Sequence, residues 1–162
     1  MKKWILILVS IILLIIDNSL MPYFKIMDSY PSLLFIFAVA YSIINGREEG
    51  IFIGVASGLL QDIFFGNVFG INALLNMIIC VIAAIIGDNI YKEKKAVPVI
   101  SMMFLYMLKV ALIYIILKLI GNTVDLKVGI FTSLYSTVIM FFGYDYVLKL
   151  YTNEYKKSKW RF

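Results

Sequence analysis

Six long apolar runs separated by short polar connectors restrict this chain more than any other feature. The runs cover approximately residues 4–21, 31–45, 50–65, 70–91, 98–120 and 129–151. In lipid a chain must satisfy its own backbone hydrogen bonds, which leaves α-helices and closed β-barrels. Barrel strands alternate polar and apolar residues over about ten positions, whereas these runs are continuously apolar. The sequence therefore predicts an all-α integral membrane protein, with six transmembrane helices in a compact bundle that forms a single domain over residues 1–162.

The composition agrees with a lipid environment. Of 162 residues, 62% are hydrophobic and 15% charged, and the mean hydropathy is +0.94, whereas soluble domains are about 45–50% apolar and about 25% charged. Six spans of roughly 20 residues each use nearly the whole chain, which leaves no room for a soluble catalytic domain. Histidine is absent, which excludes imidazole bases and the commonest metal ligand. We therefore expect no cofactor and no metal.

The distribution of basic residues predicts the orientation. Lysine and arginine are retained on the cytoplasmic side of membrane proteins. With both termini inside, eleven of the fifteen lie in cytoplasmic segments, three lie outside, and the remaining one, Lys109, lies within the fifth run. The basic tail, residues 152–162, is expected to lie against anionic headgroups of the lipid bilayer. Nucleic acid is not an expected partner, because binding it needs a solvated basic face.

The third run and the connector after it carry small residues and a carboxylate at a spacing of four. The positions are Gly54, Gly58, Asp62, Gly66 and Gly70. The first three lie along one face of a helix, and small residues at this spacing let a second helix approach closely in lipid. Internal packing of the bundle is the favoured interpretation. A face reserved for a partner protein is the alternative.

Asp62 and Lys109 are the two ionisable residues deepest in the apolar runs. Asp62 lies twelve residues into the third run, and Lys109 lies eleven residues into the fifth, which starts on the same side. Asp62 is therefore roughly 18 Å from the cytoplasmic boundary of a ~30 Å core, and Lys109 is at nearly the same depth. An unpaired charge there costs at least about 2.5–3.5 kcal/mol. We expect the two to form an ion pair or a shared polar cluster with Gln61, Asn72 and Asn76. The alternative is that Lys109 reaches an interface on its own.

The remaining carboxylates inside the runs favour no catalytic site. Asp88 and Asp145 lie near the cytoplasmic ends of their runs and Asp17 lies near an outer end, so solvated or salt-bridged positions at the membrane interface are expected. Intramembrane aspartyl proteases carry a Gly-x-Gly-Asp motif, but Asp88 follows Ile-Ile-Gly, and a serine protease site would need a histidine. One deep pair of charges without an inverted repeat also argues against ion transport. The chain is not expected to be an enzyme.

Three motifs between Tyr30 and Gly87 carry a family resemblance. They are Pro31-x-Leu33-Leu34, then Gly46-Arg47-Glu48-Glu49-Gly50 at the predicted cytoplasmic turn, and Gly58-Leu59-Leu60-Gln61-Asp62 followed by Gly66, Gly70 and Ala73-Leu74. In these motifs, and in size, number of runs and short loops, the chain resembles MreD, the small membrane protein of the bacterial rod-shape system, or elongasome.

The resemblance implies a non-catalytic scaffold in the bacterial cytoplasmic membrane. Its main partner would be the bitopic protein MreC, with the RodA glycosyltransferase, a class B penicillin-binding transpeptidase, RodZ and the actin-like MreB as further partners in lateral peptidoglycan synthesis. Because MreC offers a single transmembrane helix, the face with Gly54 and Gly58 is the expected contact. MreD-like folds are also similar to the S components of energy-coupling-factor vitamin transporters.

A true S component is the rival interpretation. An outer pocket around Asn72, Asn76 and Asp62 would then hold a vitamin or another micronutrient. S components carry an Ala-x-x-x-Ala motif on the first span, and residues 4–16 contain no alanine. The missing histidines also argue against the nickel and cobalt members.

Overall fold

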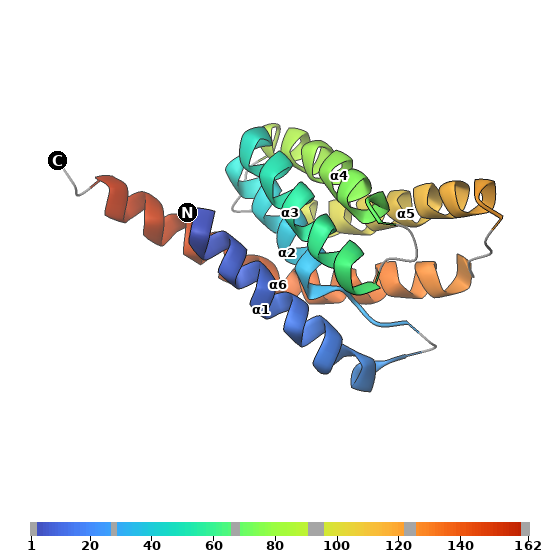
Figure 1. Ribbon diagram of the computed structural model, residues 1–162. Coiled ribbons are helices and arrows are strands. Elements are labelled where there is room, and N and C mark those ends of the chain that lie inside the picture. Colours follow the sequence, from blue (N-terminus) through green and yellow to red (C-terminus); the bar gives the residue numbers. More distant parts are fainter. Residues whose placement is uncertain (1–2, 27–28, 66–68, 91–95, 122–125, 160–162) are drawn as a thin grey trace.

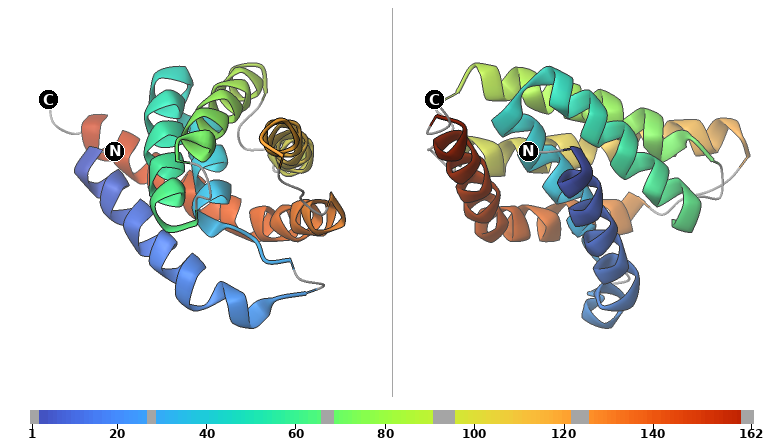
Figure 2. Two further views of the ribbon diagram at one scale, coloured as in Figure 1. Left: turned by 45° about the vertical axis from the view of Figure 1, so that its right-hand side comes forward. Right: turned by 60° about the vertical axis from the view of Figure 1, so that its left-hand side comes forward.

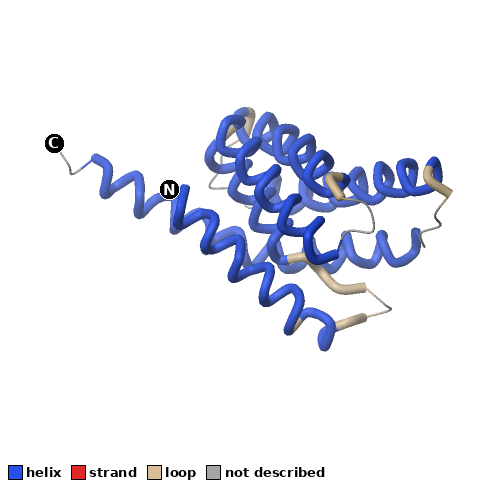
Figure 3. The backbone as a smooth tube through the Cα atoms, in the orientation of Figure 1, coloured by secondary structure: helices blue, strands red, loops and turns tan. Residues whose placement is uncertain are grey.

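The computed structural model describes residues 3–26, 29–65, 69–90, 96–121 and 126–159, without the side chains of residues 65, 126 and 151–159. Apart from an isolated bridge between Ile26 and Ser29, its regular structure is helical (Figures 1 and 3). The elements are α1 (Lys3–Ser19), the 3-10 helix η1 (Met21–Phe24), α2 (Leu33–Asn45), α3 (Arg47–Phe65), α4 (Ile71–Asp88), α5 (Ala96–Leu119) and α6 (Leu126–Lys159). The prediction of six α-helices is confirmed for the described residues.

Three segments in the described part are long and apolar enough to cross a membrane by themselves. They are Ile71–Asp88, Ala96–Leu119 and Lys127–Leu150. The apolar helix α2 has only 13 residues, or about 20 Å, which is shorter than a hydrocarbon core of about 30 Å. These lengths fit a multi-pass membrane protein in which some helices are long enough to span the hydrocarbon core and others are shorter than it.

Helix α2 lies at the centre of the bundle. Every residue from Leu34 to Ile44 is buried, which is typical of a helix that is apolar all round. It packs against all five other helices, most extensively against α3 and α4. Figure 2 shows α3 and α4 side by side on one side of it, with the α5–α6 hairpin on another. The buried hydrophobic core consists largely of α2 residues and of the side chains from α1 and α3 to α6 that pack against them.

The bundle has two ends, of which one holds the polar interior. We call the end where α1, α3 and α5 finish and α2, α4 and α6 begin the distal end. The first residues of α1 and the last turns of α6 lie at the opposite end, on the left in Figure 1. Helix α6 continues through Lys159, so a helix extends into the stretch predicted as a basic tail.

Candidate functional site

Asp62, near the end of α3, caps the beginning of α4. Its carboxylate oxygens accept hydrogen bonds from the backbone N–H groups of Gly70, Asn72 and Ala73, each at 3.0 Å, and from Asn72 Nδ2 at 3.1 Å. The first N–H groups of a helix have no partner within the helix, and a negative charge is favourable at that end. Gly70, with φ at 96°, has no side chain to supply the cap. The buried carboxylate of Asp62, only 3% exposed, therefore has its hydrogen-bond acceptors occupied without a cation.

Asp17, near the end of α1, caps the beginning of α2 in the same way. It accepts hydrogen bonds from the backbone N–H groups of Leu33 at 2.7 Å and Leu34 at 3.1 Å, and from Ser32 Oγ at 2.9 Å. Ser32 is the N-cap residue and accepts from the N–H of Phe35. The expectation of a solvated or salt-bridged Asp17 is wrong, since the residue is 2% exposed. The first turn of α2 lies against the last turn of α1 and removes the carboxylate from solvent.

Gln61 on α3 is hydrogen-bonded to residues of three other helices or their caps at the distal end. Its Nε2 donates to Ser32 Oγ at 2.9 Å, and its Oε1 accepts from Asn76 Nδ2 at 3.0 Å and from Lys109 Nζ at 3.2 Å. Lys109 Nζ also lies 4.1 Å from the centroid of the Phe35 ring, a distance at which a cation is attracted to an aromatic face. One carboxamide thereby links the N-cap of α2 with α3, α4 and α5.

The structure places the five residues of the expected polar cluster in two separate networks. Asp62 and Asn72 are bonded to each other, whereas Gln61, Asn76 and Lys109 form the second network. In the described part of the chain no salt bridge joins Asp62 to Lys109. Both oxygens of Asp62 are instead directed at the first turn of α4, so the direct ion pair is not formed.

The glycine face of α3 is covered by α4. A Cβ at Gly58 would lie 2.3 Å from Ala73 Cα, and one at Gly54 would lie 2.7 Å from Met77 Cα. Because these contacts are with backbone atoms, internal packing describes this face, and a partner helix has no room there. Of the other two glycines in the pattern, Gly70 precedes α4, and Gly66 lies outside the described residues.

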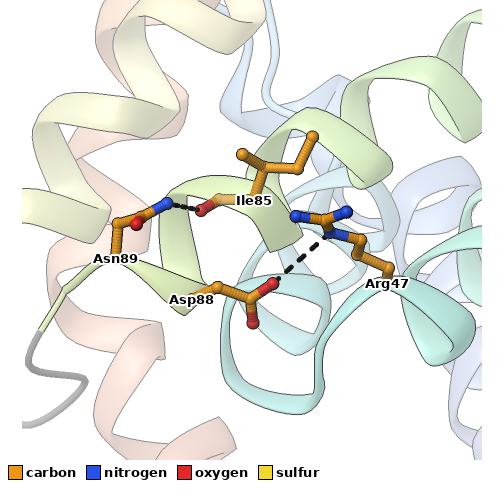
Figure 4. Close-up of polar contacts among 4 residues, drawn as sticks. All are labelled: Arg47, Ile85, Asp88 and Asn89. Atoms are coloured by element: carbon orange, nitrogen blue, oxygen red, sulfur yellow. Dashed lines mark hydrogen bonds and ion pairs between the residues drawn. The ribbon is translucent and has the colours of Figure 1, made fainter.

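The predicted cytoplasmic turn lies at the end of the bundle opposite the distal end. Arg47 Nε lies 3.4 Å from Asp88 Oδ2, with the two side chains 60% and 45% exposed (Figure 4). Asn89 Nδ2 donates to the carbonyl oxygen of Ile85 at 2.7 Å and closes the end of α4 (Figure 4). The salt-bridged position expected for Asp88 is confirmed, with Arg47 as the partner, and its place at the membrane interface stays a prediction.

The two glutamates of this turn begin α3. Glu48 and Glu49 lie in its first turn, where negative charge is favourable. Tyr41 Oη donates to Glu49 Oε2 at 3.4 Å, which ties the start of α3 to α2. These contacts give the turn a structural role.

A cavity of about 320 Å³ opens at the distal end. Its walls come from α1, the segment before α2, and α3 to α6, and the lining residues are Asp17, Ser29, Tyr30, Ser32, Gln61, Asn72, Tyr106, Lys109, Val110, Ile113, Val128, Gly129 and Thr132. Of the three residues expected around an outer pocket, Asn72 lines the cavity, while Asp62 and Asn76 lie outside its lining. Sequence reasoning missed Asp17, Ser32 and Tyr106. Of these three, only Ser32 could have been found from the sequence, because serine is a preferred N-cap residue and this one directly precedes an apolar run.

Comparison with protein families matches residues 1–153 to the family described as rod shape-determining protein MreD. No curated protein and no solved structure matches the chain. The family match covers α1 to α5 and α6 as far as residue 153. The described residues contain no group of three or more histidine, cysteine or acidic side chains that could hold a metal.

Proposed function

This chain belongs to the MreD family of rod shape-determining proteins, and we propose that it is a scaffold of the bacterial cell-elongation machinery that binds MreC. Members of the family are non-catalytic multi-pass membrane proteins. RodA, a class B penicillin-binding transpeptidase, RodZ and MreB are the further partners that we propose. We also propose that both termini face the cytoplasm, as the distribution of basic residues favours.

The observation that carries this proposal is the extent of the family match, residues 1–153 of 162. The matched part consists of the helices and their short connectors. The helical bundle itself therefore carries the family's function. Partners must contact it mainly through the outer surfaces of its helices. The single transmembrane helix of MreC has the right form for such a contact.

Gly143 on α6 marks the surface that we propose for the MreC helix. Among the helical glycines that the structure describes, the other five would each bring a Cβ within 3.1 Å of a neighbouring atom, whereas a Cβ at Gly143 would meet nothing within 4 Å. A mid-helix glycine costs roughly 0.5–1 kcal/mol relative to alanine, and no packing inside this bundle explains the cost. Small residues serve close approach of a second helix in lipid. The exposed rings of Phe142 and Tyr146 flank the position.

Depletion of this protein from its own bacterium tests the proposed function. Rod cells are expected to become round within a few generations, because lateral wall synthesis would lose its scaffold. Re-expression of the wild-type chain restores the rods, whereas Gly143→Leu, present at the same level in the membrane, does not. Cells that keep their rod shape and width after depletion would contradict the proposal.

A further inference from the structure

The Lys109 ammonium lines the distal cavity with most of its hydrogen-bonding capacity unused. The residue is 6% exposed. Of the three donors that an ammonium carries, one is used by Gln61 Oε1 at 3.2 Å. The Phe35 ring covers one side of the nitrogen, and the cavity lies beside it.

The protein supplies this ammonium with no carboxylate partner. Asp17 lines the same cavity, but its two oxygens accept three hydrogen bonds from the start of α2. The oxygens of Asp62 accept four from Gly70, Asn72 and Ala73. Within the described ranges, no carboxylate oxygen lies within 4.0 Å of Lys109 Nζ. A buried cation at membrane depth usually has a counter-charge or water, and the cavity beside the nitrogen is the place from which either can reach it.

The cavity has the size and lining of a small-ligand site. Its volume of about 320 Å³ falls in the range of about 300–1,000 Å³ that such sites occupy. Val110 and Ile113 give it apolar walls, and Tyr30 and Thr132 are polar residues on the same lining. An apolar pocket with one charged group and a few polar ones is typical of specific recognition of a small molecule.

We propose that the distal cavity binds a carboxylate or phosphate group, with Lys109 Nζ donating hydrogen bonds to its oxygens. The group belongs either to a water-soluble molecule or to the headgroup of an anionic lipid, both of which present the same oxygens to the ammonium. This site does not depend on the scaffold function, because it is formed by the chain alone.

Thermal unfolding of the purified full chain in dodecyl maltoside, a detergent without phosphate or carboxylate groups, tests the proposal. Sodium phosphate and sodium acetate, each compared with sodium chloride at equal ionic strength, are expected to raise Tm by about 2–4 °C if the site is a solute site. If the site takes a lipid headgroup, the rise appears instead when phosphatidylglycerol is added to the detergent. The absence of a rise in all of these arms would overturn the proposal.

Three variants assign the effect to the cavity. Lys109→Met should lose the rise, whereas Lys118→Met, which removes an exposed lysine near the end of the same helix, should keep it. Ile113→Phe fills the cavity while leaving the Lys109 amine in place, and it should also lose the rise in Tm. This variant provides the test if Lys109→Met does not fold. A rise that both Lys109→Met and Ile113→Phe retain would refute anion binding at this site.

Discussion

Replacing Gly58 with leucine is expected to prevent the bundle from folding. A Cβ at this position would lie 2.3 Å from Ala73 Cα and 2.4 Å from the carbonyl oxygen of Asn72. Overpacking in a core costs typically about 1–3 kcal/mol, and here the obstacle is backbone, which cannot rotate away as a side chain does. We therefore expect a loss of about 3 kcal/mol or more in the free energy of unfolding, since α3 and α4 must separate.

The measurement is the yield of monodisperse protein after detergent extraction, followed by its Tm. Gly143→Leu is the matched control, because the same substitution on α6 meets no atom within 4 Å and should leave yield and Tm unchanged. Gly58→Leu protein that is as abundant and as stable as wild type would show that α3 and α4 do not pack in this way.

Replacing Asp62 with alanine is expected to have the second largest effect. Three backbone N–H groups at the start of α4, of Gly70, Asn72 and Ala73, would lose their acceptor. A buried donor left unsatisfied costs about 1–3 kcal/mol, so the loss in stability should be about 3 kcal/mol or more. Asp62→Asn keeps one oxygen acceptor and should lie between alanine and wild type.

Asp88→Ala provides the control for this prediction. It removes an acid from the half-exposed pair with Arg47, and exposed pairs contribute about 0–1 kcal/mol. Unfolding by a denaturing detergent, followed by loss of helical circular dichroism, gives the comparison. If Asp62→Ala and Asp88→Ala were equally mild, the capping role of Asp62 would be refuted.

The helices could be predicted from hydropathy, but their different environments could not. Continuous apolar runs predict six helices because both lipid and a protein core accept such side chains. Helix α2 is buried along Leu34–Ile44 by its neighbours, and a continuous apolar run does not distinguish that position from one facing lipid. The spacing of Gly54 and Gly58 predicted a close helix contact, but it did not say that α4 would make it.

Only part of the membership of the polar interior could be predicted, and none of its hydrogen-bond partners to the backbone. The depth of Asp62 and Lys109 follows from counting residues, and both are buried. Their partners did not follow, because Asp62 is satisfied by backbone N–H groups of α4. Every residue except proline supplies such a group, so the contact leaves no trace in the sequence. The capping role of Asp17 was missed for the same reason.

Affinity purification of the tagged chain from membranes of its own bacterium tests the central claim most directly. We expect MreC to be recovered with the wild-type chain, and with Lys118→Met as a surface control, but several-fold less with Gly143→Leu at equal bait. Recovery of an energy-coupling-factor ATPase module without MreC would contradict the scaffold function and favour a transporter subunit.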